Sequence, residues 1–303
     1  TPNVVTQFFP SASQFTLSTS ANASASLQEG VKGLFGLGGS FGITERPTVT
    51  YSPLQGDQFI QRVLSPLPLQ TITLLFNSGW SVERIFRLCF QRMNNLRNAP
   101  SASGPTPKKA PKFKKFIAAT KFLRELQVQD VLDLSFHEQN RMPQLILHIA
   151  EEGKNLEAAN NFARAVNVEP GRTKYVLTFT PKPNEPDQIR VVTRSLLGIM
   201  FYLSQSVEVP QQDIRAGKVT QTLKASGEVF DWSEVTGQLF RVQSQSSYPE
   251  STMLMVYYRD SWFYIDDSDL ASKSTFSLLS QIFSLQAGKI KDTTPLLTLP
   301  VGQ

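Results

Sequence analysis

The sequence predicts an α+β fold: a long N-terminal β-hairpin, a small helical segment and then a mixed α+β body. Apolar residues recur at every second position in residues 15–28 and 41–52, which is the period of a β-strand. They recur at helical spacing in residues 82–96, and short runs of both kinds alternate after residue 113. The predicted segments are a hairpin (1–55), a helical segment (56–98), a linker (99–112), an α+β domain (113–287) and an extended tail (288–303).

The two alternating runs are long for a soluble protein and flank an apolar tip. Soluble strands usually have about 5 or 6 residues, whereas a membrane-spanning strand needs about 9 to 11. The tip, residues 33–39, is rich in Gly, Leu and Phe where a soluble loop would be polar. Glu45 and Pro47 fall on the apolar face and count against a full membrane span. The residues expected to contact membrane lipid or neighbouring subunits are Phe15, Leu17, Ala21, Ala23, Ala25, Leu27, Leu34, Phe35, Leu37, Phe41, Ile43, Val49 and Tyr51.

Residues 56–98 are predicted to form three short helices. Pro66 and Pro68 separate the first two, and Ser81 is expected to cap the third. The apolar stripe of this third helix consists of Val82, Ile85, Phe86, Cys89, Met93 and Leu96. Cys89 is the only cysteine, and its place on the stripe indicates a small core residue and not a nucleophile. The following residues, 99–112, are rich in Pro, Ser and Gly without periodicity, which indicates a linker and a domain boundary.

The α+β domain is predicted from shorter patterns. Helices are expected at residues 113–127, 156–166, 188–204 and 275–285, and strands at 131–136, 144–148, 174–180, 239–242, 253–258 and 262–265. Lysines alternate with phenylalanines in the first helix, but no DNA-binding or RNA-binding signature accompanies them. We therefore interpret them as a solvated helix face and expect no nucleic-acid partner. The apolar tail is expected to pair with a sheet edge or with another subunit.

Composition and motifs do not favour an enzyme. The net charge of +5 is compatible with an anionic partner but identifies none, and no run approaches the ~18 apolar residues of a membrane helix. His137 and His148 lack a matching acid cluster, and no phosphate-binding glycine motif or serine elbow occurs. Asp266, Asp267 and Asp269 fit helix capping better than a calcium loop. We predict no catalytic, metal or cofactor site.

Aromatic residues gather in the predicted strand pair between residues 253 and 265. Tyr257, Trp262 and Tyr264 are candidates for binding a partner, because such rings stack on a sugar or on a partner's side chain. Cross-strand packing inside the sheet explains the same residues equally well, and both interpretations stay open.

Four stretches of the chain carry a family resemblance: VTYSPLQGDQFIQRVLSPLPL, NSGWSVERIFRLCFQRMNNL, RSLLGIMFYLSQSVEVP and YRDSWFYIDDSDLASKSTFSLLSQIFSLQAG. They resemble an uncharacterised family of Gram-negative bacterial proteins, often predicted to be secreted lipoproteins. The resemblance covers most of the chain, but it implies no activity and no catalytic residues. It implies a location in the periplasm or at the outer membrane. The chain begins at Thr1 without Met or a signal sequence, which indicates a processed chain or a fragment, and a lipid-attachment segment would lie before Thr1.

Together, the hairpin and the resemblance predict a non-enzymatic structural protein of the cell envelope that forms a homo-oligomer. A single hairpin in lipid would leave backbone groups unpaired, at a cost of several kcal/mol each. Hairpins from several subunits would therefore have to close an outer-membrane β-barrel or collar. The alternative is a soluble periplasmic adaptor that binds a protein or glycan partner and whose hairpin packs in a complex without touching lipid. The expected partners are further copies of the chain, outer-membrane lipid and other envelope proteins.

Overall fold

The computed structural model describes residues 13–25, 39–51, 56–182, 185–250, 252, 254–287 and 297–300. The chain divides into two compact units, one made of Thr1–Ile60 with Lys289–Gln303 and the other of Gln61–Gly288. Helices and mixed sheets occur together, which confirms the predicted α+β class.

The first unit is built on a long antiparallel strand pair. Strand β1 (Ser13–Ala25) pairs with β2 (Gly39–Tyr51) without a register shift. Strand β12 (Leu297–Pro300) pairs antiparallel with β2 and ends where Pro300 lies opposite Thr48. The next residue of β2 is Pro47, and neither proline has a backbone N–H to donate to a ladder. The alternating runs and the apolar tail of the sequence correspond to these three strands.

The remaining helices and strands follow in chain order. The first are α1 (Gly56–Leu64), α2 (Leu69–Asn77), α3 (Val82–Cys89), β3 (Phe90–Met93), β4 (Leu96–Arg97), the 3₁₀-helix η3 (Pro100–Ser103) and α4 (Lys114–Val128). The next are β5 (Leu132–Gln139), β6 (Met142–Ile149), α5 (Glu157–Val166), β7 (Lys174–Thr178), β8 (Gln188–Thr193), α6 (Leu196–Ser204) and α7 (Gln211–Arg215). The last are α8 (Ser233–Thr236), β9 (Gln243–Gln245), β10 (Leu254–Tyr258), β11 (Ser261–Ile265) and α9 (Leu270–Ala287).

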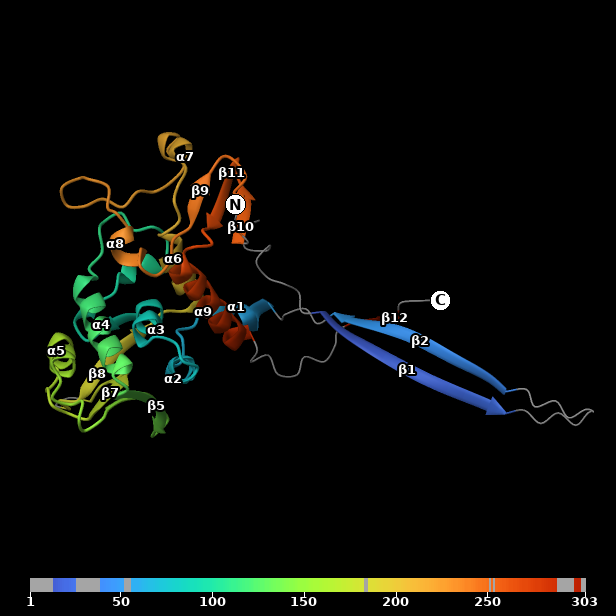
Figure 1. Ribbon diagram of the computed structural model, residues 1–303, viewed down its shortest axis with the longest axis horizontal. Helices are drawn as coiled ribbons and strands as arrows, with labels where there is room; N and C mark the ends of the chain where they lie inside the picture. Colours follow the sequence, from blue (N-terminus) through green and yellow to red (C-terminus); the bar gives the residue numbers. More distant parts are fainter. Residues whose placement is uncertain are drawn as a thin grey trace, which may run out of the picture. The chain divides into compact units, whose positions relative to one another are not determined.

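The larger sheet of the second unit has the strand order β4-β3-β8-β7-β6-β5. Strands β7 and β8 are parallel, and the other neighbouring strands are antiparallel. Helices α4 and α5 lie over one face of this sheet (Figure 1). Met93, Leu147, Tyr175 and Val191 are buried beneath them, and Phe162 of α5 packs edge-on against Tyr175 with ring centroids 6.3 Å apart. Sequestering these apolar side chains from water is the main force that holds the layers together.

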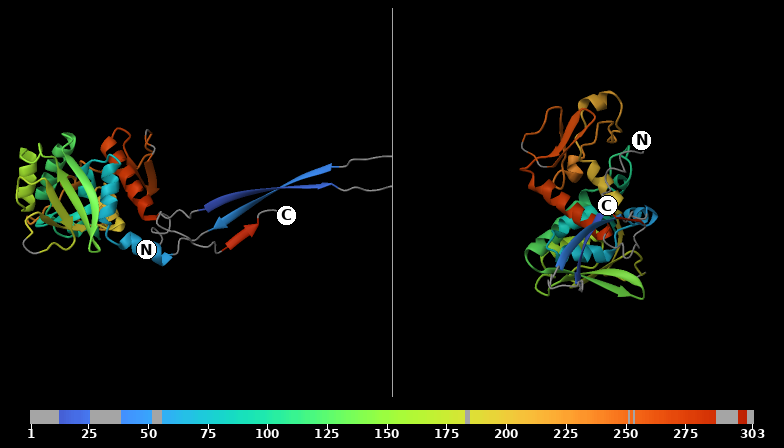
Figure 2. Two further views of the ribbon diagram at one scale, coloured as in Figure 1. Left: turned by 90° about the horizontal axis from the view of Figure 1, so that it is seen from below. Right: turned by 90° about the vertical axis from the view of Figure 1, so that its right-hand side faces the viewer.

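The smaller sheet has the strand order β10-β11-β9 and lies beside α9 (Figure 2). Leu278 and Ile282 of α9 are fully buried. Arg84 of α3 reaches this helix, where its Nη1 donates to the carbonyl of Ala271 and to Oγ1 of Thr275 at 2.6 Å each. The C-terminal helix is therefore tied to the helical segment at the start of the second unit.

Helix α3 ends earlier than its apolar stripe predicts. The stripe continues through Met93 and Leu96, but the backbone changes from helix to strand after Cys89. Asn98 explains part of the change, because its Nδ2 donates to the carbonyls of Arg87 and Phe90 at 2.8 Å each and so satisfies the end of the helix. Cys89 itself is buried as expected, and its burial raises the pKa of the thiol to about 12.

The predicted helix at residues 188–204 is also corrected. Residues 188–193 form strand β8, and the helix α6 begins only at Leu196. Ile189 and Val191 are buried while Arg190 between them is exposed, which is strand periodicity. Ser195 then caps α6, its Oγ accepting the N–H of Gly198 at 3.0 Å.

The predicted strand at residues 239–242 is replaced by the turn after α8, and strand β9 begins at Gln243. Val242 forms an isolated parallel bridge with Val207. The hydrophobic run is explained by burial alone, because Leu239 and Phe240 are both buried without belonging to a strand.

The predicted linker at residues 99–112 does not separate two domains. It lies within the second unit, where Ala99 and Ala102 are fully buried and the N–H of Ala99 donates to the carbonyl of Lys112 at 3.0 Å. Lys109 forms a bridge with Leu223. The helical segment and the α+β domain therefore share one core, because β3 and β4 pair into the larger sheet through β8.

Candidate functional site

The predicted lipid or subunit contacts that the structure describes lie along β1 and β2. The register brings apolar positions of the two strands opposite one another, so they share one face of the ladder. These pairs are Phe15 with Val49, Leu17 with Pro47, Ala21 with Ile43, and Ala23 with Phe41. Ala25 lies opposite Gly39, and Tyr51 opposite Ser13. The other predicted contacts, Leu27, Leu34, Phe35 and Leu37, lie outside the described residues.

Within the described residues, the hairpin has long strand edges without a partner. Strand β1 pairs with β2 alone, and β12 covers β2 only over residues 48–51. An unpaired edge presents a row of backbone N–H and C=O groups that can pair with a strand from another chain. The described edges of β1 and β2 are therefore open to pairing with a further strand.

The three predicted partner-binding residues come together on one face of the smaller sheet. Tyr257 of β10 lies opposite Trp262 of β11, with ring centroids 5.0 Å apart. Tyr264 is two positions from Trp262 along β11 and therefore shares its face. Tyr248, in the segment between β9 and β10, packs edge-on against Trp262, also at 5.0 Å. We call Tyr248, Tyr257, Trp262 and Tyr264 the aromatic face.

Polar groups lie at the ends of these rings. The Tyr264 hydroxyl lies 3.1 Å from Oε1 of Gln243 and 3.0 Å from Oε1 of Gln245, and can donate to either. The Tyr257 hydroxyl donates to Oδ1 of Asp260 at 3.3 Å. Loss of solvation and the neighbouring Asp260 carboxylate raise the pKa of Tyr257, so its phenol stays protonated at neutral pH and remains a hydrogen-bond donor.

The aromatic face is open to solvent. The side chains of Tyr248 and Tyr257 are 57% and 54% exposed. Ser261 and Ile265, on the opposite face of β11, are buried, so the sheet packs onto the body through that opposite face. Exposed rings with hydrogen-bonding ends are enriched at surfaces that bind proteins, and they also stack on sugars. The exposed rings of Tyr248 and Tyr257 therefore form an aromatic contact surface on this sheet.

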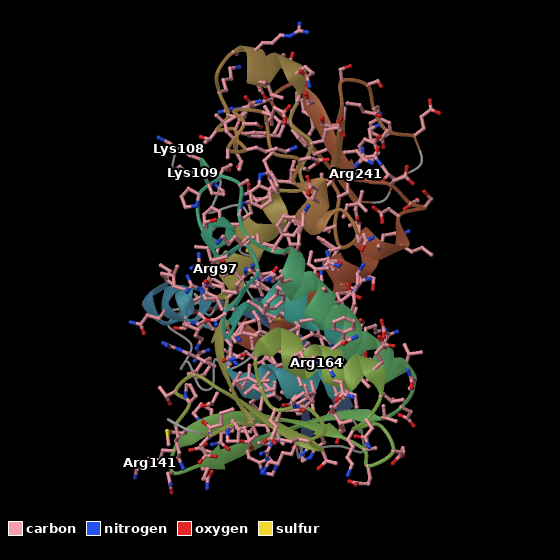
Figure 3. The ribbon with its side chains drawn as sticks, turned by 90° about the vertical axis from the view of Figure 1, so that its left-hand side faces the viewer. Arg97, Lys108, Lys109, Arg141, Arg164 and Arg241 are labelled. Atoms are coloured by element: carbon pink, nitrogen blue, oxygen red, sulfur yellow. The ribbon has the colours of Figure 1, made fainter. Side chains whose placement is uncertain are left out.

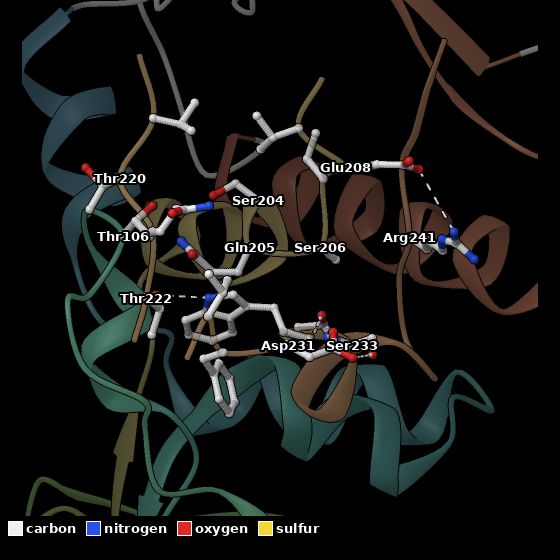
Figure 4. Close-up of a pocket in the computed structure, with 18 of the residues that line it drawn as sticks. Thr106, Ser204, Gln205, Ser206, Glu208, Thr220, Thr222, Asp231, Ser233 and Arg241 are labelled. Atoms are coloured by element: carbon white, nitrogen blue, oxygen red, sulfur yellow. Dashed lines mark hydrogen bonds and ion pairs between the residues drawn. The ribbon is translucent and has the colours of Figure 1, made fainter. Parts of the chain in front are cut away.

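A separate cavity of about 1020 Å³ lies between the segments around residues 201–209 and 219–241. Figure 4 shows Thr106, Thr220 and Thr222 on one side of it and Glu208 and Arg241 on the other. Its two carboxylates are both engaged: Glu208 lies 3.9 Å from Arg241, and Asp231 accepts hydrogen bonds from the N–H and hydroxyl of Ser233. The bonds from Ser233 hold the pKa of Asp231 below its usual value, so this group is a poor proton donor at neutral pH.

The two histidines meet at one serine on β5. Oγ of Ser135 lies 2.9 Å from Nε2 of His148 and 3.2 Å from Nε2 of His137. Among the described residues, no carboxylate lies within 4.0 Å of either imidazole. The group therefore has a hydroxyl and a base but lacks the acid that orients a catalytic histidine.

The acidic cluster before α9 acts as a helix cap. Asp269 accepts hydrogen bonds from the N–H and the hydroxyl of Ser272, at 2.9 and 2.6 Å. Asp266 accepts equivalent bonds from Ser268, which hold the pKa of its carboxyl below the usual range. In the part of the chain that the structure describes, no three His, Cys, Asp or Glu side chains gather as a metal site.

Tyr248 of the aromatic face and the two glutamines that contact Tyr264 were not predicted from the sequence as part of a binding site. Gln243 and Gln245 lie on a strand that was predicted too early in the chain, and Tyr248 follows it in a serine-rich segment without periodicity. The tyrosine before Pro249 was the only available signal, and a single aromatic residue in a loop does not indicate which ring it will touch.

No protein-family model, curated protein or solved structure matches the chain. Across the described residues, no helix is both long enough and apolar enough to cross a membrane. The α+β class is the structural classification that the described residues support.

Proposed function

We propose that the chain is a non-enzymatic structural protein of the Gram-negative cell envelope whose hairpins pair edge to edge in a homo-oligomer and complete an outer-membrane β-barrel or collar. The observation that carries the proposal is the uninterrupted register of two strands of 13 residues. Soluble strands rarely reach this length. The sequence resemblance supports the envelope location.

The strand length fits a bilayer. At about 3.4 Å per residue, 13 residues extend to about 44 Å. A tilt of about 40°, typical of membrane strands, reduces the reach to about 34 Å, compared with about 30 Å for the hydrocarbon layer. A membrane barrel also requires that every backbone group in lipid is paired. The unpaired edges of the hairpin would allow neighbouring copies to pair and meet this requirement.

The charged positions of the hairpin suggest how deep it would insert. Strand β1 contains no residue that is charged at neutral pH, and the charged residues of β2 are the adjacent Glu45 and Arg46. The register sets Glu45 opposite Thr19, in the middle of the ladder. A hairpin that spans the bilayer therefore holds Glu45 near mid-depth, and we propose that this position faces a subunit contact and not lipid, because intramembrane charges are paired within the protein. Residues 20–25 and 39–44, nearer the tip, carry no charge, and their apolar positions would face lipid.

Flotation with liposomes tests this proposal. The intact chain is expected to float with vesicles and to form detergent-resistant oligomers, whereas a variant lacking residues 29–40 is expected to stay at the bottom as a small species. The reason is that the deletion removes the apolar tip that must cross the bilayer first. Circular dichroism provides the control, because the body of the deleted protein should remain folded. If both proteins stay at the bottom with the same mass, the hairpin is not a membrane element.

A second candidate function is that of an adaptor that binds a protein or glycan through the aromatic face. The specific observation is the exposure of Tyr248 and Tyr257 on both sides of the Trp262 ring. Three adjacent rings give a contact surface with little side-chain entropy to lose on binding. The amide oxygens of Gln243 and Gln245 lie beside this surface and can accept hydrogen bonds from sugar hydroxyls.

Neighbouring residues of β10 provide a matched test of the adaptor function. Tyr257→Ala is expected to weaken binding of an envelope protein or soluble oligosaccharide by about tenfold or more, in line with the loss of one stacked ring. Val256→Ala removes a side chain that is equally exposed, at 58%, but lies on the opposite face, and should leave the affinity unchanged. Titration monitored by tryptophan fluorescence measures both. Equal losses in the two variants would contradict a site on the aromatic face.

A further inference from the structure

The basic residues of this chain are distributed very unevenly. No Asp or Glu occurs between Glu83 and Glu125, although the whole chain has a net charge of only +5. The basic residues of this interval are Arg84, Arg87, Arg92, Arg97, Lys108, Lys109, Lys112, Lys114, Lys115, Lys121 and Arg124. A long run of one charge sign is a potential binding surface if the fold brings its members together on the exterior.

The fold uses the first two of these arginines internally. Arg87 is buried, with Nη1 3.0 Å from Oε1 of Glu83 and Nη2 donating to the carbonyl of Val235 at 3.0 Å. Arg84 binds helix α9, as described above. The residues that follow, from Arg92 onward, are available for the surface.

The next arginines form a row on the face of the larger sheet that is opposite α4 and α5. Arg92 of β3 lies directly across from Arg97 of β4, and both side chains are exposed. Arg190 is exposed on the adjacent strand β8 and lies on the same face, because Val192, two positions along, is the register partner of Arg92. Like charges directly opposite each other in a sheet are destabilising.

Three lysines continue this row beyond the edge strand β4. A hollow of about 510 Å³ is lined by Arg97 together with Lys112, Lys114 and Lys115. Its other lining residues are Asn95, Leu96, Pro111 and Phe113, so the hollow contains four cations and no carboxylate. We call Arg92, Arg97, Arg190, Lys112, Lys114 and Lys115 the basic face. Figure 3 shows Lys108 and Lys109 above Arg97 along the same edge of the molecule.

The charges of the basic face are almost unneutralised. Among the described residues, Lys114 is its one member with a carboxylate within 4.0 Å, at 3.4 Å from Glu234. That ion pair is exposed and contributes little. The other five cations have no carboxylate within 4.0 Å among the described residues, so their mutual repulsion lowers stability, and a bound polyanion would remove this repulsion.

We propose that the basic face binds the surface of an anionic phospholipid membrane. Guanidinium and ammonium groups bind phosphate, the former through two parallel hydrogen bonds. The aromatic residues on these segments, Phe90 and Phe113, are buried, so no ring is available to stack on the base of a nucleic acid. Cations on a sheet face and around its edge strand need only an array of phosphates, and clusters of four to eight Lys or Arg residues are typical of such binding. This proposal does not depend on insertion of the hairpin.

Sedimentation with vesicles tests the proposal on the full chain. Vesicles of phosphatidylcholine are compared with vesicles that also contain about one third phosphatidylglycerol. The native chain is expected to bind the anionic vesicles more tightly, and this difference should disappear at high salt. The triple variant R97E/K112E/K115E should bind the anionic vesicles roughly a hundredfold more weakly, because each basic residue near the surface contributes about fivefold.

The variant R141E/R164E/R215E is the matched control, since it changes the net charge equally at exposed positions outside the basic face. It should keep most of the native binding. Equal losses in the two variants would overturn the proposal, as would equal binding of the native chain to both kinds of vesicle. The proposal would also be overturned if a DNA duplex bound the native chain and displaced it from anionic vesicles.

If the charge reversals prevent folding, the variant R97Q/K112Q/K115Q measures the contribution of the same three cations to vesicle binding. Since hairpin insertion requires no anionic lipid, deletion of the tip affects binding to both vesicles, and the two proposals fail independently.

Discussion

Replacing Arg194 by methionine is expected to lower the free energy of unfolding by about 3 to 5 kcal/mol, because several buried carbonyls lose their hydrogen-bond donor. Arg194 is fully buried at the end of β8, in the connection to α6. Burial lowers the pKa of its guanidinium to about 10, so the group remains charged at neutral pH. Its stabilising partners are backbone carbonyls, the Ser103 hydroxyl and one aromatic ring.

The contacts of Arg194 explain the size of the expected effect. Nη1 donates to three carbonyls, those of Arg87 and Leu88 at 3.1 Å each and that of Phe90 at 2.8 Å. Nη2 donates to the carbonyl of Asn98, and Nε donates to Oγ of Ser103 at 3.0 Å. The guanidinium also lies 4.0 Å from the centroid of the Tyr202 ring. Methionine fills a similar volume but leaves buried acceptors unpaired, each of which costs about 1 to 3 kcal/mol. The carbonyls of Arg87 and Phe90 also accept hydrogen bonds from Nδ2 of Asn98, which limits the total loss of stability.

Denaturant unfolding followed by circular dichroism measures this prediction. Arg164→Met, an exposed position on α5, is the control and should change the free energy of unfolding by less than about 0.5 kcal/mol. Arg194→Lys keeps the charge with fewer donors and should give an intermediate loss, which remains measurable if Arg194→Met fails to fold. A loss below about 1 kcal/mol for Arg194→Met would show that the carbonyls find other donors.

Replacing Ala23 by aspartate is expected to reduce liposome binding of the chain by roughly fivefold to a hundredfold per subunit. Ala23 lies opposite Phe41 on the face of the hairpin that we propose to contact lipid. A carboxylate on the lipid face of a membrane strand costs about 1 to 3 kcal/mol at depth, which corresponds to this range. In an oligomer the cost is repeated in every copy, so the detergent-resistant species should also disappear.

Ser24→Asp is the matched control for this prediction. Ser24 is the next residue and lies opposite Ser40, so the same charge is introduced at the same depth but on the polar face. Liposome flotation and the mass of the detergent-resistant species compare the two variants. Similar flotation of Ala23→Asp and Ser24→Asp would mean that Ala23 is not lipid-exposed and would favour the adaptor function.

The fold class and the nature of most elements could be predicted from local periodicity. The alternation around Phe15 and Phe41 predicted β1 and β2, because a period of two is intrinsic to a strand. The helical spacing of Phe116, Leu123 and Leu126 likewise predicted α4, where all three are buried. Such patterns depend only on which residues face the core.

Part of the aromatic face could also be predicted from local sequence patterns. Tyr257 and Trp262 occur in adjacent strands joined by a short turn, so their pairing follows from the hairpin register. Tyr248 joins them through the path of a loop, which no periodicity describes. The basic face was missed because Arg190 is far in sequence from Arg92 and Arg97, and β8 was assigned to a helix.

By itself, the sequence determined the class of fold, the strand nature of β1 and β2 and the buried position of Cys89. Only the tertiary structure decided where α3 ends and where β8 begins. An apolar stripe can continue as helix or as strand, and the choice depends on which partner satisfies the terminal backbone groups. Here Arg194 binds the last carbonyls of α3, and β8 pairs with β3 over a separation of about 100 residues. Local patterns contain no information about such distant donors, because hydrogen bonds form only after the chain has brought them together.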